Sequence, residues 1–422
     1  MSKVSIDAAG PIEAPAQPVD AAPVDPSAVA LAGYRARMRP KTRVYIAVLA
    51  LITVAIIVLV QVVLRTGEIG NATLHPAKTA LPGPTGTTTS ATLTEAWHST
   101  DATATGIPYD TGTVVTYDRH TVTGRNYATG AAVWTYTRSD VSTCNVFQEF
   151  GIAVAIYTDR DGYCDEADAF DTSTGARKWE RTLDSNGNTV NGPVVMTATQ
   201  YTLMIVDPNY IQAVDPVSAI DRWTFIDPPG CTNTSAVQGS VGVLISQHCG
   251  NGNHLILRDA YASDDNDNKA KADWNVLSDA IPVSADGLIT ALDPSTGQLM
   301  VYSSTDGTAQ DSQILTPLPV TTQAPAITNA VTSVGEVVTI NSTSYALATA
   351  TGAQLWTLAG ASRLTTQDTD PLVINGQGIT EIDPSTGRSI ASFAISPPPT
   401  GSVAYKLGTG FVVAGSSTTV YR

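Results

Sequence analysis

A tight-turn pattern that recurs at a nearly constant spacing constrains this chain more than any other feature. Its fullest copy is segment 171–179, Asp-Thr-Ser-Thr-Gly-Ala-Arg-Lys-Trp. An acidic or amide side chain bonds the backbone N–H groups that follow it, and Gly accepts a positive φ, so this order of residues is typical of a tight turn. With the Gly as reference, equivalent positions follow at intervals of 45, 44, 44, 44, 45 and 35 residues: Gly130, Gly175, Ala219, Ser263, Gly307, Gly352 and Gly387.

A tryptophan stands four residues after the reference position in several copies of the turn. An indole at the start of the strand that follows a turn can bury a large apolar surface. We therefore expect these side chains to pack between neighbouring sheets and to have a structural role: Trp134, Trp179, Trp223 and Trp356.

The length of the repeat predicts a fold class. A period of about 40–45 residues with several short strands is typical of a β-propeller, whose blades are four-stranded sheets around a channel. Apolar and β-branched runs at 191–197, 201–206 and 210–214 are separated by polar turns, as expected for three strands of one blade. The sequence thus predicts an all-β propeller domain.

The ends of the repeat region predict how the ring closes. Eight segments qualify as third strands, which favours eight blades, although an out-of-phase copy of the turn at 292–297 leaves seven possible. The last third strand ends at Arg422 without a Trp strand, whereas segment 95–98 holds Trp97 and has no blade before it. Because a closed ring leaves no open sheet edge, we expect the N-terminal strand to complete the C-terminal blade.

The repeats resemble the PQQ-type, or quinoprotein-like, propeller repeat, whose consensus contains Leu-Asp-x-x-Thr-Gly-x-x-x-Trp. Segments 292–297 and 382–387 also carry its Asp-Pro-Ser-Thr-Gly core. The resemblance implies the propeller fold and raises the hypothesis of a PQQ-dependent dehydrogenase. Those enzymes bear adjacent disulfide-bonded cysteines, a calcium-holding Glu/Asn/Asp set and a catalytic Asp. This chain has no adjacent cysteines, so the resemblance implies the fold rather than this activity.

The N-terminal part of the chain predicts a membrane anchor. Segment 44–64 contains 21 residues without a charge, enough to cross a hydrocarbon core of about 30 Å as a single transmembrane helix. Segment 1–43 is rich in Ala, Pro and Asp and ends in five Lys and Arg residues, so we expect a disordered cytoplasmic tail with a basic flank. Segment 65–93, rich in Thr, Pro and Gly, is expected to be a flexible stalk before an extracytoplasmic propeller at 94–422.

The four cysteines agree with an extracytoplasmic location. Cys144 and Cys164 lie 20 residues apart, and Cys231 and Cys249 lie 18 apart. Of the three possible connectivities we favour these two local disulfides. Neither spacing suits a zinc or redox site.

The polar residues predict no catalytic, cofactor-binding or metal-binding site. The five histidines form no ligand spacing, and no nucleophile elbow, P-loop or haem motif is present. Most aspartates are better explained as turn residues, including Asp171, Asp215, Asp293 and Asp383. The Asp-rich run 264–268 resembles a calcium loop, but it has Lys269 and Asn275 where such a loop needs Gly and Glu. We expect an exposed insertion there.

These features predict a non-catalytic protein of the cell membrane. The net charge is −15 and no basic stripe is present, which excludes nucleic acid as a partner. The topology and composition resemble actinobacterial membrane-anchored propellers that bind trehalose mycolate glycolipids beside an RND-type lipid transporter, and imply glycolipid trafficking. The alternative is a protein–protein scaffold for envelope assembly, by resemblance to the bacterial propeller that scaffolds outer-membrane protein assembly. A PQQ-dependent dehydrogenase is the least favoured function.

Overall fold

The computed structural model divides the chain into two compact units, Met1–Arg65 and Thr66–Arg422. The structure describes residues 40–66, 68–86, 89–108, 111–159, 162–183, 195–198, 202–206, 210–259, 272–310, 327–332, 334–340, 343–359, 362–367, 370–375, 378–397 and 403–422. Of the tail 1–43 that was predicted to be disordered, residues 1–39 lie outside these residues and residues 40–43 are helical; the Asp-rich run 264–268 also lies outside them.

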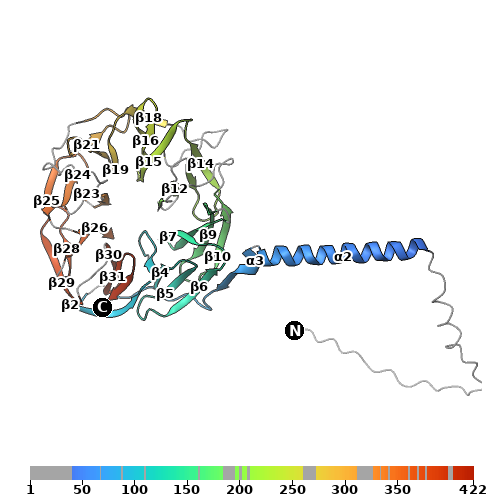
Figure 1. Cartoon of the computed structure of the whole chain (residues 1–422). Helices are drawn as coiled ribbons and strands as arrows, with labels where there is room; N and C mark the ends of the chain where they lie inside the picture. Colours follow the sequence, from blue (N-terminus) through green and yellow to red (C-terminus); the bar gives the residue numbers. More distant parts are fainter. Residues whose placement is uncertain are drawn as a thin grey trace, which may run out of the picture. The chain divides into compact units, whose positions relative to one another are not determined.

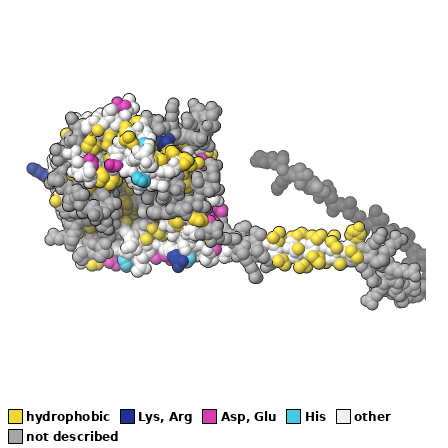
Figure 2. Space-filling view, turned by 45° about the horizontal axis from the view of Figure 1, so that its top comes forward, with side chains coloured by type: hydrophobic (Ala, Val, Ile, Leu, Met, Phe, Trp, Pro, Cys, Tyr) yellow, Lys and Arg dark blue, Asp and Glu magenta, His cyan; other side chains and the backbone are white. Residues whose placement is uncertain are grey.

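The described part of the first unit is helix α2, Pro40–Thr66, whose last residue belongs to the second unit. Segment 44–64 is helical, and the described side chains from Val44 to Val60 are mostly large, apolar and exposed; Figure 2 shows them in yellow along the helix. Within the described residues, no helix reaches the length and hydropathy needed to cross a membrane. The membrane span at 44–64 stays a prediction from the sequence.

The second unit is a ring of small antiparallel sheets around a central space (Figure 1). We number its blades in chain order. Blade 1 comprises β3 (Ala102–Thr103), β4 (Thr113–Tyr117), β5 (Thr121–Asn126) and β6 (Ala132–Arg138). Blade 2 comprises β7 (Thr143–Glu149), β8 (Ile152–Thr158), β9 (Cys164–Asp171) and β10 (Arg177–Thr182). Blade 3 comprises β11 (Val195–Ala198), β12 (Leu203–Val206), β13 (Tyr210–Val214) and β14 (Asp221–Ile226). Blade 4 comprises β15 (Cys231–Gln238), β16 (Val243–Cys249), β17 (Gly252–Arg258) and β18 (Ala272–Leu277).

The remaining strands form four more blades. Blade 5 has three described strands, β19 (Ile281–Asp286), β20 (Leu288–Asp293) and β21 (Gln298–Tyr302). Blade 6 comprises β22 (Ile327–Val331), β23 (Gly335–Ile340), β24 (Thr343–Ala348) and β25 (Gln354–Ala359). Blade 7 comprises β26 (Ser362–Gln367), β27 (Asp370–Asn375), β28 (Gly378–Ile382) and β29 (Ser389–Ser396). Blade 8 comprises β30 (Val403–Leu407), β31 (Gly410–Ala414), β32 (Thr418–Tyr421) and β2 (Thr92–Ser99).

The N-terminal strand completes the last blade, as the sequence predicts. Strand β2 pairs antiparallel with β32, and its first three residues also run parallel to the end of β29. This second pairing joins blades 7 and 8 into one eight-stranded sheet. The described strands thus group into eight blades, in agreement with the higher of the two predicted counts.

The core lies between blades, because both faces of a middle strand are covered. On β8, Ile152, Val154 and Ile156 pack in a cluster that includes residues of blade 3. The alternating Ala153, Ala155 and Tyr157 pack in a cluster with residues of blade 1. Successive side chains of a strand point to opposite faces, so these middle strands form nearly continuous apolar runs instead of alternating with polar residues.

Three of the repeated turns receive the tryptophan of the preceding blade in the same way. The indole N–H groups of Trp134, Trp179 and Trp356 donate hydrogen bonds of 2.8, 2.9 and 2.8 Å to the backbone carbonyls of Thr172, Pro216 and Pro384. Each acceptor directly follows the Asp of the next blade's turn. All six tryptophans are buried: Trp97, Trp134, Trp179, Trp223, Trp274 and Trp356. The turn and the tryptophan are therefore two halves of one contact between blades.

The out-of-phase copy of the turn occupies a different place in its blade. Segment 293–297 joins β20 to β21, which are the second and third strands of blade 5. The in-phase copies with described strands on both sides join the third strand to the fourth. Any tight antiparallel connection can use the same turn chemistry, which explains why this copy breaks the period without adding a blade.

The segment expected to be a flexible stalk is instead partly attached to the propeller. After the short helix α3, Glu68–Asn71, strand β1, Ala72–His75, pairs with the outer strand β6 of blade 1. Further on, the backbone N–H of Ala77 donates a 2.8 Å hydrogen bond to the carbonyl of Thr174 in blade 2. The composition of 65–93 predicted flexibility, but its backbone groups find partners on the exposed sheet edge of β6.

Candidate functional site

The two ends of the ring are built from different connections. One end, which we call the turn face, contains the connections from first to second strand, and from third to fourth strand in the blades where these two strands are consecutive in the chain. The other end, the opposite face, contains the remaining connections. The repeated tryptophan contacts lie on the turn face, because they involve the turns between third and fourth strands.

Both predicted disulfides are confirmed, and both lie on the opposite face. Cys144 and Cys164 join the beginnings of β7 and β9, with Cα atoms 6.0 Å apart. Cys231 and Cys249 join the start of β15 to the end of β16, where the two residues are paired in the sheet. The chain has no free cysteine.

The repeated aspartates serve the backbone, as turn chemistry predicts. The Asp383 carboxylate accepts hydrogen bonds from the backbone N–H groups of Ser385 and Thr386 at 2.8 and 3.1 Å. The hydrogen bond from the Ser385 hydroxyl is the main cause that lowers the pKa of Asp383. Burial opposes ionisation of Asp171, yet hydrogen bonds from Ser173 and Lys178 lower its pKa as well. These carboxylates are ionised and already engaged within their turns.

Four of the described histidines have separate local partners. His98 Nδ1 lies 3.0 Å from the Thr419 hydroxyl, and His120 Nδ1 lies 2.7 Å from the carbonyl of Val141. His248 and His254 contact neighbouring asparagine side chains. Among the residues that the structure describes, no three His, Cys, Asp or Glu side chains come together as a possible metal site.

The largest charged cluster is a structural contact between blades 1 and 2. The buried guanidinium of Arg138 donates hydrogen bonds to Asp140 and Glu166 at 3.0 and 2.8 Å. Arg177 lies 3.3 Å from Asp168, which also accepts a hydrogen bond from the Tyr136 hydroxyl. Each carboxylate of this cluster faces a guanidinium, which suits a buried ion-pair network.

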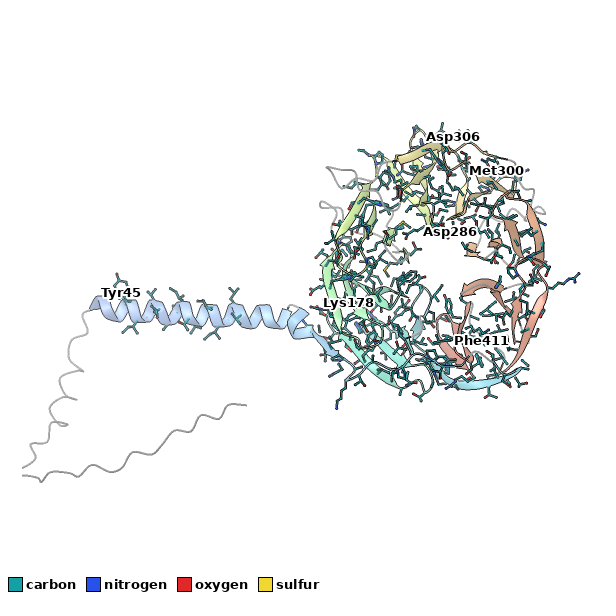
Figure 3. The ribbon with its side chains drawn as sticks, turned by 180° about the vertical axis from the view of Figure 1, so that it is seen from behind. Tyr45, Lys178, Asp286, Met300, Asp306 and Phe411 are labelled. Carbon is teal, nitrogen blue, oxygen red and sulfur yellow. A yellow bond between two sulfur atoms is a disulfide. The ribbon has the colours of Figure 1, made fainter. Side chains whose placement is uncertain are left out.

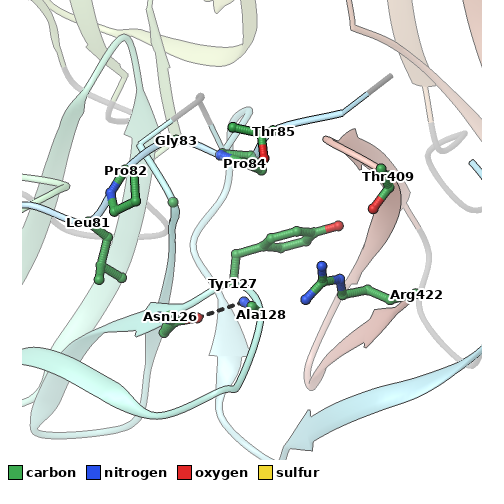
Figure 4. A pocket seen from close by; sticks show the side chains of 11 residues that line it. Leu81, Pro82, Gly83, Pro84, Thr85, Asn126, Tyr127, Ala128, Thr409 and Arg422 are labelled. Atoms are coloured by element: carbon green, nitrogen blue, oxygen red, sulfur yellow. Dashed lines mark hydrogen bonds between the residues drawn. The ribbon is translucent and has the colours of Figure 1, made fainter. Parts of the chain in front are cut away.

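A cavity of about 310 Å³ lies on the turn face, at the junction of blades 1 and 8 (Figure 4). Segment 81–85 borders it on one side. Tyr127, from the first repeated turn, and Thr409 and Arg422, from blade 8, complete its polar part. We call this cavity the junction pocket.

The junction pocket combines an aromatic ring, a cation and an apolar wall. The Arg422 guanidinium carbon lies 5.5 Å from the centre of the Tyr127 ring, within the range of a cation–π contact. Burial raises the pKa of Tyr127 to about 12, against the lowering effect of the Arg422 charge and the Gly410 backbone. The phenol is therefore a neutral hydroxyl at physiological pH. Leu81, Pro82 and Pro84 supply apolar surface.

Sequence reasoning missed the junction pocket. Segment 81–85 reads Leu-Pro-Gly-Pro-Thr and was assigned to the stalk, although two prolines lower the cost of ordering an extended segment. The other lining residues belong to the two ends of the propeller, which no local pattern connects.

Comparisons with known proteins support the repeat assignment. Residues 83–225 match the family model described as outer membrane protein assembly factor BamB. This part of the chain consists of PQQ-type propeller repeats. No curated protein matches the chain.

Several solved structures are similar to the chain at low sequence identity. A computationally designed protein, Ika8, is similar to the chain with a TM-score of 0.54 and 11% identity, over 78% of this chain and 98% of that one. BamB from Moraxella catarrhalis has a TM-score of 0.48 and 16% identity, over 78% and 99% of the two chains. A quinohemoprotein alcohol dehydrogenase, ADHIIG, from Pseudomonas putida HK5 has a TM-score of 0.49 and 11% identity, over 78% and 76%.

Proposed function

We propose that this protein is a non-catalytic, membrane-anchored propeller that binds protein partners during assembly of the cell envelope. In this proposal residues 44–64 cross the membrane once, the tail at 1–43 lies in the cytoplasm and the PQQ-type propeller lies outside. The uncharged run inside α2 and the basic residues before it support this topology. Two disulfides support an oxidising, extracytoplasmic compartment.

The match of residues 83–225 to an assembly-factor family is the observation that carries the proposed scaffold role. The structure is compatible with a scaffold role, because the carboxylates of the repeated aspartates accept hydrogen bonds within their own turns. A scaffold requires a surface for partners and no reacting groups.

Chemical crosslinking of the full-length chain in membranes of its native host tests the scaffold role. We expect a crosslinked envelope protein that is lost when the propeller is deleted, and digestion of the propeller by protease added to the outside of intact cells. Protease resistance until the membrane is opened would refute the topology. A lipid crosslinked to the propeller at one copy per chain, without any protein adduct, would refute the scaffold role.

Glycolipid trafficking beside a membrane transporter is the second candidate function. The junction pocket favours it in one respect, since an apolar wall faces a hydroxyl and a guanidinium. Its volume of about 310 Å³ is near the lower limit for small-molecule pockets, so it suits a sugar head group better than long acyl chains. Native mass spectrometry with lipid extraction on the full chain distinguishes the two functions, because a stoichiometric glycolipid supports trafficking.

A further inference from the structure

We infer that one sector of the turn face, formed by blades 5 and 6, docks a partner segment in which apolar residues are flanked by Lys or Arg. The inference rests on the proposed function, because it assumes a protein partner. It specifies where that partner binds and which chemistry it carries. Three observations lead to it: the distribution of exposed apolar side chains, the distribution of charge, and the position of two carboxylates.

Exposed apolar side chains are concentrated on the turn face. Among the described propeller residues, nine large apolar side chains are at least 38% exposed, and seven of them lie in turns of this face or within two residues of a strand end there. These seven are Phe150, Val217, Ile220, Val331, Val334, Leu355 and Ile390. Only Ile226 and Leu277 lie at the other end of their strands. Such a one-sided distribution is expected for an interaction surface.

Blades 5 and 6 supply three of these seven side chains. Val331 ends the first strand of blade 6, Val334 lies in the turn that follows, and Leu355 is the second residue of its outer strand. They are 43%, 42% and 42% exposed. Val334 stands between Thr332 and Gly335, whose backbone and hydroxyl groups bond each other across the turn. The turn is therefore held in shape while its apolar side chain faces solvent.

The same sector contains no positive side chain. Blades 5 and 6, residues 281–359, include five Asp and Glu and no Lys, Arg or His, although the whole chain has 23 Lys and Arg. Elsewhere on the turn face, basic side chains accompany the repeated aspartates. Lys178 lies 3.3 Å from Asp171 and Arg222 lies 2.9 Å from Asp215. Blades 5 and 6 contain no basic side chain of their own that could neutralise their carboxylates in this way.

Two carboxylates of the sector lie on the turn face. Asp286 ends the first strand of blade 5, beside β22 of blade 6, and accepts a hydrogen bond from the backbone N–H of Ser240. Asp306 belongs to the turn after β21, and hydrogen bonds from Ser303 and Thr308 lower its pKa. Figure 3 shows Asp286 toward the interior of the ring and Asp306 at its outer rim. Blade 5 thus presents one negative charge near the inner side of the turn face and one at its outer rim.

The partner that fits this surface carries cations and apolar groups together. Apolar side chains supply contact area for Val331, Val334 and Leu355, and a Lys or Arg beside them meets an unneutralised carboxylate. An acidic segment would meet like charges. Anionic lipid head groups would be repelled for the same reason.

Binding of short synthetic peptides to the full-length protein in detergent tests this chemistry. The probes are a Leu/Lys peptide, a Leu/Glu peptide and a Ser/Lys peptide of equal length, measured by fluorescence anisotropy. We expect the Leu/Lys peptide to bind at least tenfold more tightly than either of the others, with an affinity that falls as salt is added. Equal binding of the Leu/Glu peptide would overturn the charge requirement, and equal binding of the Ser/Lys peptide would overturn the apolar one.

Variants locate the site. The double variant Asp286→Lys/Asp306→Lys and the variant Val334→Ser are each expected to weaken Leu/Lys binding at least fivefold. Leu277→Ser, which removes an exposed leucine from the opposite face, is the matched control and should leave binding unchanged. Thermal melts establish that all variants are folded. If Leu277→Ser weakens binding as much as Val334→Ser, the assignment to the turn face is wrong.

A photo-crosslinking residue placed at Val334 or at Leu277 of the full chain, in native membranes, separates failure of this surface from failure of the proposed function. Protein adducts from Val334 and not from Leu277 support the inference. Protein adducts from Leu277 alone refute the inferred surface and leave the scaffold role standing. Lipid adducts from both positions, with no protein adduct, refute the scaffold role and the inference together.

Discussion

The indole N–H of Trp97 donates a 2.7 Å hydrogen bond to the backbone carbonyl of Tyr127. Trp97 lies on β2, the outer strand of blade 8, and Tyr127 lies in the repeated turn of blade 1. This contact follows the same rule as the tryptophan contacts between successive blades. It therefore extends the repeat across the junction where the ring closes.

Removing the Trp97 side chain should destabilise the closed ring. Trp97→Ala is expected to lower the free energy of unfolding by about 3–5 kcal/mol, because a buried indole is replaced by a cavity. Trp97→Phe keeps much of the packing and loses the hydrogen bond to Tyr127, which should cost less, with about 1 kcal/mol from the hydrogen bond. Denaturant titration measures both. An equal loss of unfolding free energy in the two variants would show that packing of the indole is not the main contribution to stability.

Alanine substitutions at two glycines of the turn face distinguish the cost of backbone strain from the cost of crowding. Gly130 and Gly151 have φ values of 72° and 76°. A Cβ on Gly130 would lie 2.7 Å from the Trp97 ring, whereas a Cβ on Gly151 meets nothing within 4 Å. Gly151→Ala should therefore cost about 1–2 kcal/mol from conformation alone. Gly130→Ala should cost a further 1–3 kcal/mol, roughly, for overpacking. Thermal melts that rank the variants in the opposite order would contradict the docking of Trp97 on this turn.

The attachment of segment 81–85 depends on Gly112. A Cβ at this position would lie too close to the backbone carbonyl of Pro82, so Gly112→Ala should displace the segment and open the junction pocket. Hydrogen exchange at residues 72–86 should become at least tenfold faster while exchange in blade 4 stays the same. Unchanged exchange at 72–86 would mean that the segment is held without this contact.

The two disulfides should stabilise the folded propeller by restricting the unfolded chain. Each closes a loop of about 20 residues, with separations of 20 and 18, for which chain entropy predicts about 3 kcal/mol. Cys144→Ser/Cys164→Ser and Cys231→Ser/Cys249→Ser are each expected to lower the unfolding midpoint in denaturant. A midpoint that does not move on reduction of the wild-type protein would contradict this expectation.

Glu149 should make stability fall as the pH rises. Burial raises the pKa of Glu149 to about 8, whereas the same group in the unfolded chain titrates near 4.3. Between these values the folded state retains a proton that the unfolded state has lost, so stability decreases by up to about 1.4 kcal/mol per pH unit. The loss is absent below the unfolded pKa and complete above the folded one. Comparing Glu149→Gln with wild type between pH 4 and 9 should show a flatter profile for the variant.

The sequence by itself determined the parts of this fold that are local and repeated. The spacing from Asp171 through Gly175 to Trp179 predicted the turn and the buried indole, because both halves of the contact recur in several repeats. Ring closure through Trp97 followed from a strand without a blade at one end and a blade without a strand at the other. The pairing of Cys144 with Cys164 followed from their short separation.

Only the tertiary structure decided what depends on contacts between distant segments. The turn at 293–297 has the same local chemistry whether it joins second to third or third to fourth strands, so its place in blade 5 could not be read from its residues. The composition of 72–86 predicts a linker, and only the free edge of β6 and the turn face of blades 1 and 8 give it partners. The junction pocket exists because closing the ring brings residues from both ends of the propeller onto one face, and a one-dimensional pattern does not encode that arrangement.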